Sequence, residues 1–192
     1  DKNEKSISLR PEGTAGVVRS IIEKKLDNES HRFWYLGPMW RYERPQKGRY
    51  RQFFQAGVEL IGYEEGLSEL EMISLVISIN SELNIKDSII KINHLGDKKA
   101  KESFCQSLKK YLEPYKSELD EKDIDRLSKN PLRILDSKNS NTQKILKNAP
   151  KISDFISDEA SNLLNTIKNT YLENHIEIDH SLVRGLDYYT GF

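Results

Sequence analysis

The feature that most restricts the fold of this chain is a basic, turn-like stretch between two apolar arms. Positions 41–51 hold five arginine or lysine residues and a single acid, so this stretch carries a local charge of +4. Pro45 and Gly48 favour a turn, and the arms at 33–40 and 53–62 are rich in strand-forming residues. The pattern predicts a long β-hairpin with a basic loop. Guanidinium groups in such a loop are suited to bind a polyphosphate, because each can grip two oxygens.

The composition limits what the rest of the chain can do. The 192 residues are enough for one domain, or for one domain with a smaller insert. The 30 basic and 30 acidic residues balance, so any nucleic-acid contact must come from a local patch. No stretch has the apolar length of a membrane span, and residues 1–5 lack the apolar core of a signal peptide. The single Cys105 fits a reducing cytoplasm, and the 4 histidines lack metal-ligand spacing, so we expect no protein-built metal site.

The hydrophobic periodicity predicts helices and strands in alternation up to about residue 96, after which the amino-acid composition changes. The expected elements are helices at 15–26 and 68–83, the first capped by Thr14, and strands at 88–95, 176–178 and 181–183. Between 97 and 174 the chain is rich in Lys, Glu and Ser, with leucines in a helical pattern broken by prolines. We therefore expect an α+β fold with a core at 1–96, a helical insert at 97–174 and a return to the core at 175–192.

Several runs resemble the histidyl-tRNA synthetase family of class II aminoacyl-tRNA synthetases. These runs are the stretch 37–53 with its Arg41-Tyr42-Glu43, which resembles motif 2 of that class, Leu-Arg-Pro-Glu-Gly-Thr at 9–14, Gln-Ala-Gly-Val-Glu at 55–59, Asn-Pro-Leu-Arg-Ile-Leu-Asp-Ser-Lys at 130–138 and Leu-Val-Arg-Gly-Leu-Asp-Tyr-Tyr at 182–189. Together they cover essentially the whole chain and are specific, whereas Arg-x-Glu alone would carry little weight. The resemblance implies a mainly antiparallel sheet flanked by helices, with a helical insertion domain. Motifs 1 and 3 of the class are not found, so we expect a central catalytic fragment that is weak or inactive by itself.

The activity that the resemblance implies is ATP-dependent activation of L-histidine to histidyl-adenylate, followed by transfer to tRNA(His). Arg41 and Arg184 would be catalytic, because each could stabilise charge that develops at the α-phosphate. Further contacts to ATP would come from Glu43 at the adenine amino group, Arg49 at the β- and γ-phosphates, and Phe53 beneath the base. Magnesium would arrive on the nucleotide phosphates.

The resemblance also supplies a set of residues for the amino acid. Glu12, Thr14 and Gln55 would recognise the α-amino group, while Glu59 and Tyr189 would meet the two ring nitrogens. The full predicted histidine-binding set is Glu12, Gly13, Thr14, Gln55, Glu59, Tyr188 and Tyr189. A carboxylate and a phenol placed opposite the two ring nitrogens would discriminate strongly, because a wrong side chain leaves them unpaired.

Each of these residues also has an ordinary structural alternative. Glu43 could form an ion pair with Arg44, Phe53 could be a core aromatic residue, and Glu59 could face water. For the whole chain, one alternative is a non-catalytic relative that serves as regulatory subunit of ATP phosphoribosyltransferase. Such relatives tend to lose the motif residues and the helical insert, and both are present here. A generic nucleotide-binding module would explain the basic loop but not the imidazole set. The full-length parent is expected to be a homodimer without a membrane partner.

Overall fold

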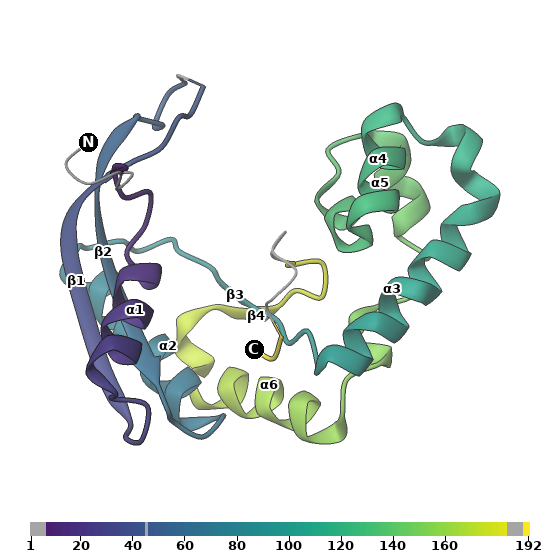
Figure 1. The fold of residues 1–192 in the computed structure, drawn as a ribbon. Coiled ribbons are helices and arrows are strands. Elements are labelled where there is room, and N and C mark those ends of the chain that lie inside the picture. The colour runs from purple at the N-terminus through teal and green to yellow at the C-terminus, as the bar shows by residue number, and fades with distance from the viewer. Residues whose placement is uncertain (1–6, 45, 184–189) are drawn as a thin grey trace. The chain divides into compact units, whose positions relative to one another are not determined.

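The computed structural model describes residues 7–44, 46–183 and 190–192, which fall into two compact units, Asp1–Ser68 and Glu69–Phe192 (Figure 1). The first unit contains helix α1 (Thr14–Lys24) and strands β1 (His31–Trp40) and β2 (Gln52–Ile61). Helix α2 (Leu67–Glu82) begins at its end. Helices and small sheets occur together, so the predicted α+β class is confirmed.

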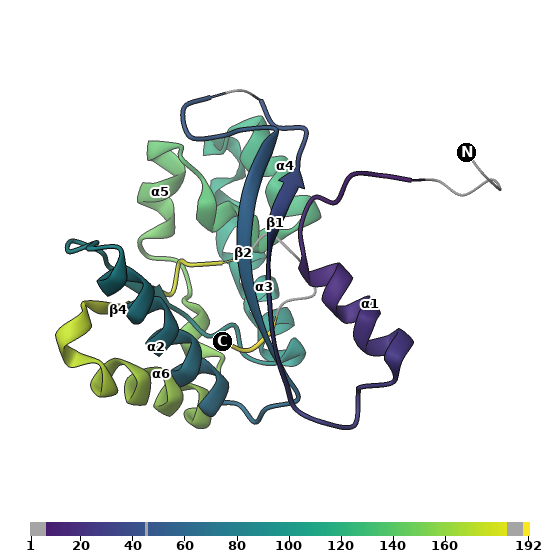
Figure 2. The same ribbon diagram turned by 90° about the vertical axis from the view of Figure 1, so that its left-hand side faces the viewer.

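The predicted hairpin is confirmed and forms the frame of the first unit. Strands β1 and β2 pair antiparallel from His31 opposite Ile61 to Trp40 opposite Gln52, and they run side by side next to α1 (Figure 2). The arms extend beyond the strands, because the backbone N–H of Arg41 donates to the carbonyl of Arg51 at 2.9 Å. A bridge between Gln46 and Arg49 then closes the turn.

Helix α1 is the predicted amphipathic helix, but its first turn is capped differently from the prediction. Gly13 is the N-cap and makes no side-chain bond, while Glu12 Oε1 accepts the N–H of Ala15 at 2.9 Å. The prediction that Thr14 caps this helix was wrong. Its hydroxyl instead donates to Glu59 Oε1 at 2.6 Å, because the helix starts directly beside β2 and a carboxylate is within reach.

The second unit is mostly helical and includes one parallel strand pair, β3 (Ile90–Ile92) with β4 (Ile176–Ile178). Its other elements are α3 (Lys98–Leu112), η1 (Glu113–Glu118), α4 (Glu121–Lys129), η2 (Pro131–Asp136), α5 (Ser140–Leu146), η3 (Ile152–Asp154), α6 (Asp158–Thr170) and η4 (Leu172–Asn174). The strand predicted at 181–183 is not formed. The N–H of Leu182 donates to Asp179 O at 2.9 Å, so the chain turns directly after β4. The division at 1–96, 97–174 and 175–192 stays a prediction.

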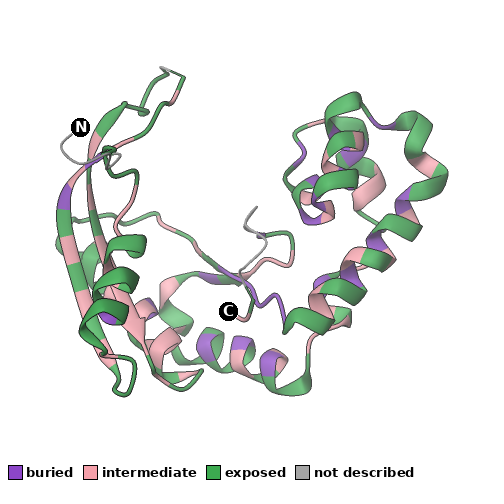
Figure 3. Ribbon diagram, in the orientation of Figure 1, coloured by how far each residue is buried: buried purple, intermediate pink, exposed green. Residues whose placement is uncertain are grey.

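Burial differs between the units, as the colouring of Figure 3 shows. In the described part of the first unit the buried hydrophobic side chains are Ile21 and Met39. The second unit contains two clusters, one built on α3, α4 and η2, and one joining α2 and α6 to β3 and β4. On the face of the hairpin that α1 does not share, Trp34 and Phe54 are 78% and 73% exposed. None of the described helices is long and apolar enough to span a membrane.

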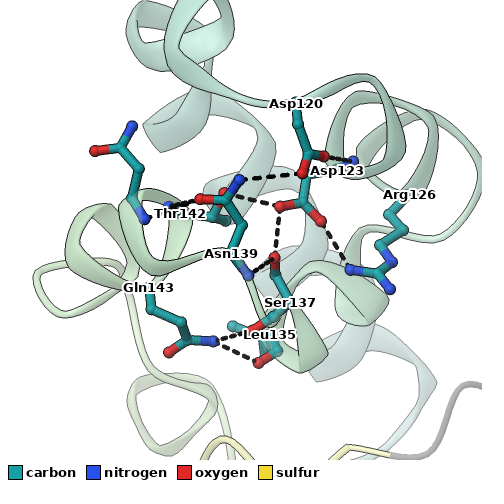
Figure 4. A network of polar contacts seen from close by, with 9 residues as sticks. Asp120, Asp123, Arg126, Leu135, Ser137, Asn139, Thr142 and Gln143 are labelled. Atoms are coloured by element: carbon teal, nitrogen blue, oxygen red, sulfur yellow. Dashed lines mark hydrogen bonds and ion pairs between the residues drawn. The ribbon is translucent and has the colours of Figure 1, made fainter.

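A buried carboxylate ties three segments of the second unit together (Figure 4). Asp123, which is 1% exposed, accepts hydrogen bonds from Ser137 Oγ at 2.5 Å, Thr142 Oγ1 at 2.7 Å and Arg126 at 2.8 Å. Its neighbour Asp120 accepts the N–H of Asp123 and the side-chain amide of Asn139, and these bonds lower the pKa of Asp120. Helix α4, the segment after η2 and helix α5 are therefore joined around one charge.

Candidate functional site

The register of the hairpin places three predicted site residues on one face of β2. Phe53, Gln55 and Glu59 are separated by even numbers of residues, and side chains along a strand alternate between its two faces. The cross-strand neighbour of Gln55 is Gly37, and a Cβ atom at Gly37 would overlap the Arg10 guanidinium, so Arg10 occupies the space over that glycine. The register thus places Phe53, Gln55 and Glu59 on one surface of the strand, and their roles toward adenine and imidazole stay predictions.

The segment at 9–14 lies against the same hairpin, and the residues that bond the two are 28 or more positions apart in sequence. The N–H of Trp40 donates to Arg10 O at 2.9 Å, and Arg10 Nε donates to Pro38 O at 3.0 Å. Arg41 Nε donates to Pro11 O at 2.8 Å. With the bond from Thr14 to Glu59, four contacts bring this segment to the hairpin.

Tyr35 occupies a central place that the sequence analysis did not predict. Its ring lies so close to the backbone of Gly13 and Gly57 that a Cβ atom at either position would overlap it. Both glycines are therefore required by close packing. The Tyr35 hydroxyl accepts a weak hydrogen bond of 3.4 Å from Gln55 Nε2. A cavity of about 340 Å³ beside Tyr35 lies between α1 and β1 and is also lined by Arg10 and Gly13.

The side-chain oxygen of Gln55 on this surface is buried and lacks a hydrogen bond to any described residue. Among the described residues, its Oε1 is the one buried side-chain oxygen or nitrogen without a hydrogen-bond partner. Leaving such an acceptor unpaired costs about 1–3 kcal/mol. The half-buried Glu59 carboxylate lies on the same face and accepts a hydrogen bond from Thr14. An acceptor without a partner and a carboxylate can together take a ligand that brings N–H donors.

At the open end of the hairpin, the first catalytic candidate is already engaged by neighbouring groups. Arg41 donates to Pro11 O, and its guanidinium lies 4.9 Å from the centre of the Phe53 ring. Phe53 is half-buried and packs under this cation. A base stacked on the same ring face would have to share it with Arg41 or displace it.

The acid of the basic loop forms an ion pair, and its partner differs from the sequence alternative. Glu43 Oε2 accepts from Arg49 at 3.2 Å, whereas the alternative named Arg44. The turn brings Arg49 back across the loop to Glu43. Arg44 directly follows Glu43, and side chains of adjacent residues in an extended chain point to opposite sides. The Arg49 side chain is 60% exposed, so water screens this pair and a competing anion can separate it.

The remaining predicted site residues, Arg184, Tyr188 and Tyr189, lie outside the described residues. Their proximity to Arg41 therefore stays a prediction. Within the described ranges, no group of three or more His, Cys, Asp or Glu side chains could hold a metal ion.

The turn after β4 holds a carboxylate whose pKa is strongly lowered. Asp179 accepts from Lys91 Nζ at 2.9 Å and from Ser181 Oγ at 2.5 Å. The bond from Lys91, followed by that from Ser181, lowers the pKa of Asp179 to about 2. The same bond to Asp179 raises the pKa of Lys91. The charged pair therefore fixes the chain at the end of β4.

Comparison with known proteins agrees with this geometry. A family model described as Histidyl-tRNA synthetase matches residues 1–192. The chain belongs to the histidyl-tRNA synthetase family. It is 47% identical to a histidine--tRNA ligase of Francisella philomiragia and 50% identical to one of Francisella tularensis subsp. novicida, covering 100% of this chain in both and 46% and 47% of those proteins. A crystal structure of apo S. aureus histidyl-tRNA synthetase superimposes with a TM-score of 0.73 at 37% identity, covering 100% of this chain and 45% of that one.

The chain thus spans less than half the length of the histidyl-tRNA synthetases that it matches. Within that span the predicted site residues that the structure describes lie in the first unit, either on the hairpin or in the segment at 9–14 beside it, whereas the run at 130–138 lies in the second unit. Tyr35 and Arg10 were missed as members of this surface. Arg10 lies inside the run at 9–14, and Tyr35 lies opposite Gly57 in the strand register. Neither position in the sequence distinguishes these two residues from their neighbours as ones that pack against the surface.

Proposed function

We propose that this chain provides the histidine- and ATP-binding core of a histidine–tRNA ligase. In the first reaction a carboxylate oxygen of L-histidine attacks the α-phosphorus of ATP, the bond to the bridging oxygen breaks, and pyrophosphate leaves with the electron pair. The aminoacyl group then passes to tRNA(His). The observation that carries the proposal is the unpartnered Gln55 Oε1 on the same face of the hairpin as Glu59, which is bonded to Thr14.

In the amino-acid site, different residues can bind different parts of the histidine. Gln55 Oε1 accepts from the α-ammonium group, which adds the partner that this atom lacks. Glu59 accepts from one imidazole N–H, with Thr14 orienting its carboxylate. Glu12 helps to fix the start of α1 and, with it, the position of Thr14. Gly13 lets Tyr35 close the wall of the site, and Tyr188 and Tyr189 complete the pocket.

In the nucleotide site the cations provide the electrostatic catalysis. Arg41 and Arg184 stabilise the negative charge that grows at the α-phosphate, and Arg49 exchanges Glu43 for the β- and γ-phosphates. Glu43 is then free to accept from the adenine amino group. Magnesium enters bound to the phosphates and supplies further charge neutralisation.

The wider setting is part of the same proposal. The parent enzyme is a cytoplasmic homodimer, and residues 97–174 form its helical insertion domain. Because the chain spans less than half of its relatives, we expect the 192-residue protein alone to exchange pyrophosphate slowly or not at all. Retention of both the motif residues and the helical segment favours the ligase over a regulatory subunit of ATP phosphoribosyltransferase.

The test is ATP–pyrophosphate exchange by a full-length ligase that carries these 192 residues in place of the matching ones of the Francisella enzyme. Exchange should depend on histidine and be absent with other amino acids. Glu59→Gln should weaken histidine binding by about 10- to 100-fold, since a hydrogen bond to a charged group is removed. Glu23→Gln, the same chemical change on the exposed side of α1, is the matched control. Exchange without amino-acid preference, or unchanged histidine affinity in Glu59→Gln, would refute the assignment.

A further inference from the structure

Three residues after β3 (Asn93, Leu95 and Gly96) hold the chain just before and just after the stretch 183–190. Strands β3 and β4 are parallel, so the segments that follow them leave from the same edge. At the start of the stretch, Asn93 Nδ2 donates to Leu182 O at 2.9 Å. At its end, the N–H of Leu95 donates to Gly191 O at 2.7 Å and the N–H of Gly191 donates to Gly96 O at 2.8 Å. The points where the chain enters and leaves this stretch are therefore fixed by residues 93–96.

Asn93 makes the one side-chain contact among these anchors. It is 7% exposed, and Val183, next to the carbonyl that it binds, is 6% exposed. Its amide nitrogen faces Leu182 O, so its Oδ1 faces His180, whose Nδ1 lies 3.3 Å away. Because that oxygen can only accept, His180 carries its proton on Nδ1. Both ends of the buried amide are thus occupied, which gives it one orientation.

We propose that Asn93 is a positioning residue for adenylate formation, which it supports by fixing the chain two residues before Arg184. This inference rests on the proposed function, in which Arg184 stabilises charge at the α-phosphate. A guanidinium acts on that charge only at the right distance, and a displacement of about 1 Å can cost about 100-fold in rate. His180 supports Asn93 from the side opposite Leu182.

The variant that tests this is Asn93→Asp in the full-length ligase carrying these residues. The aspartate keeps the size and the acceptor toward His180, but it loses the N–H donor and places a carboxylate oxygen against Leu182 O. Histidine-dependent pyrophosphate exchange should fall by about 100-fold. Asn141→Asp is the matched control, since Asn141 Nδ2 also donates to a distant carbonyl, Glu118 O at 3.1 Å, within the helical region. Its exchange rate should equal that of the parent.

A double-mutant cycle separates positioning from a general loss of structure. If Asn93 acts through Arg184, the variant with both Asn93→Asp and Arg184→Ala should be no more than about threefold slower than Arg184→Ala alone. If the two effects multiply, Asn93 acts independently of Arg184 and the inference is wrong. Unchanged exchange in Asn93→Asp would also overturn it. In either case the histidine-dependent exchange of the parent would still support the proposed function.

A second pair of variants covers the case in which Asn93→Asp does not fold. His180→Leu removes the donor to Asn93 Oδ1 and should slow exchange by about tenfold. His180→Asn can place an amide N–H where Nδ1–H stood, and it should restore most of the rate. Equal rates in these two variants would contradict the inference. Thermal unfolding of each variant shows that the rates compare folded proteins.

Discussion

Buried polar groups differ between the two units. The Asp123 network of the second unit gives its buried carboxylate hydrogen-bond donors, whereas the hairpin face of the first unit contains a buried oxygen that has none among the described residues. Asp123 accepts from three donors and is almost fully buried. Gln55 leaves a buried oxygen without a partner. Both regions draw on segments distant in sequence, so long-range assembly alone does not mark a site.

The two arrangements differ in the hydrogen-bonding capacity that they leave for a ligand. A buried carboxylate with a complete set of donors has no capacity for a ligand, and it contributes by joining segments. A buried acceptor without a donor makes the free protein less stable and becomes favourable only when a ligand supplies the missing N–H. We therefore expect the network to be structural and propose the hairpin face as the substrate-binding surface, and four substitutions test this distinction.

The largest effect is expected at the network. Asp123→Ala leaves Ser137, Thr142 and Arg126 without their acceptor and should lower the free energy of unfolding of the second unit by about 3 kcal/mol. Urea denaturation would measure it. Asp125 lies on the same helix but forms a surface ion pair with Lys129. Asp125→Ala should therefore change the free energy of unfolding by less than about 0.5 kcal/mol. Equal losses in the two variants would contradict a structural role for Asp123.

A packing change should affect the hairpin face next. Gly57→Ala places a Cβ against the Tyr35 ring, and we expect about 2 kcal/mol of destabilisation together with weaker histidine binding. Gly16→Ala is the control, because a Cβ there meets no atom within 4 Å and Ala favours the helix by about 1 kcal/mol. Calorimetric unfolding and histidine titration of a full-length ligase would report both. A Gly57→Ala protein as stable as the parent would show that Tyr35 can move aside.

The unpartnered acceptor makes the most direct comparison of stability with binding. Gln55→Leu removes the unsatisfied oxygen and should stabilise the first unit by about 1 kcal/mol while abolishing histidine binding. Gln52→Leu, at an exposed position of the same strand, should leave binding intact. A Gln55→Leu variant that is less stable than the parent would mean that the oxygen already has a partner in solution.

The smallest effect is a pH-dependent one at the end of β4. The pKa of Asp179 is lowered from 3.8 to about 2, so its ionised form stabilises the fold above pH 4, and the gain is lost as the pH falls toward 2. Asp179→Asn should lower the free energy of unfolding by about 1 kcal/mol at pH 7, since water screens part of the interaction. Denaturation at a series of pH values should show the two proteins converging below pH 4. A constant difference would argue against the charged pair with Lys91.

Local patterns predicted much of this molecule correctly. The hairpin arms, the helix at 68–83 and the strand at 176–178 follow from apolar spacing and turn residues, which act over short distances. Predictions that depended on a neighbour from elsewhere in the chain were less successful. The helix cap assigned to Thr14 was wrong because the helix begins at Thr14 itself, with Gly13 as the N-cap, and the Thr14 hydroxyl donates to a carboxylate 45 residues away. The strand expected at 181–183 turned instead, because Asp179 holds the chain after β4.

Residue types and their spacing thus encode most of the elements, the family and the identity of the motif residues. The meeting of distant groups comes from the tertiary fold: Thr14 with Glu59, Glu43 with Arg49, Tyr35 with two glycines, and Asn93 with the chain that leads to Arg184. The physical reason is that a hydrogen bond or a close packing contact depends on positions to within an ångström. Those positions come from the folding of whole segments against one another, which spacing along the chain does not encode.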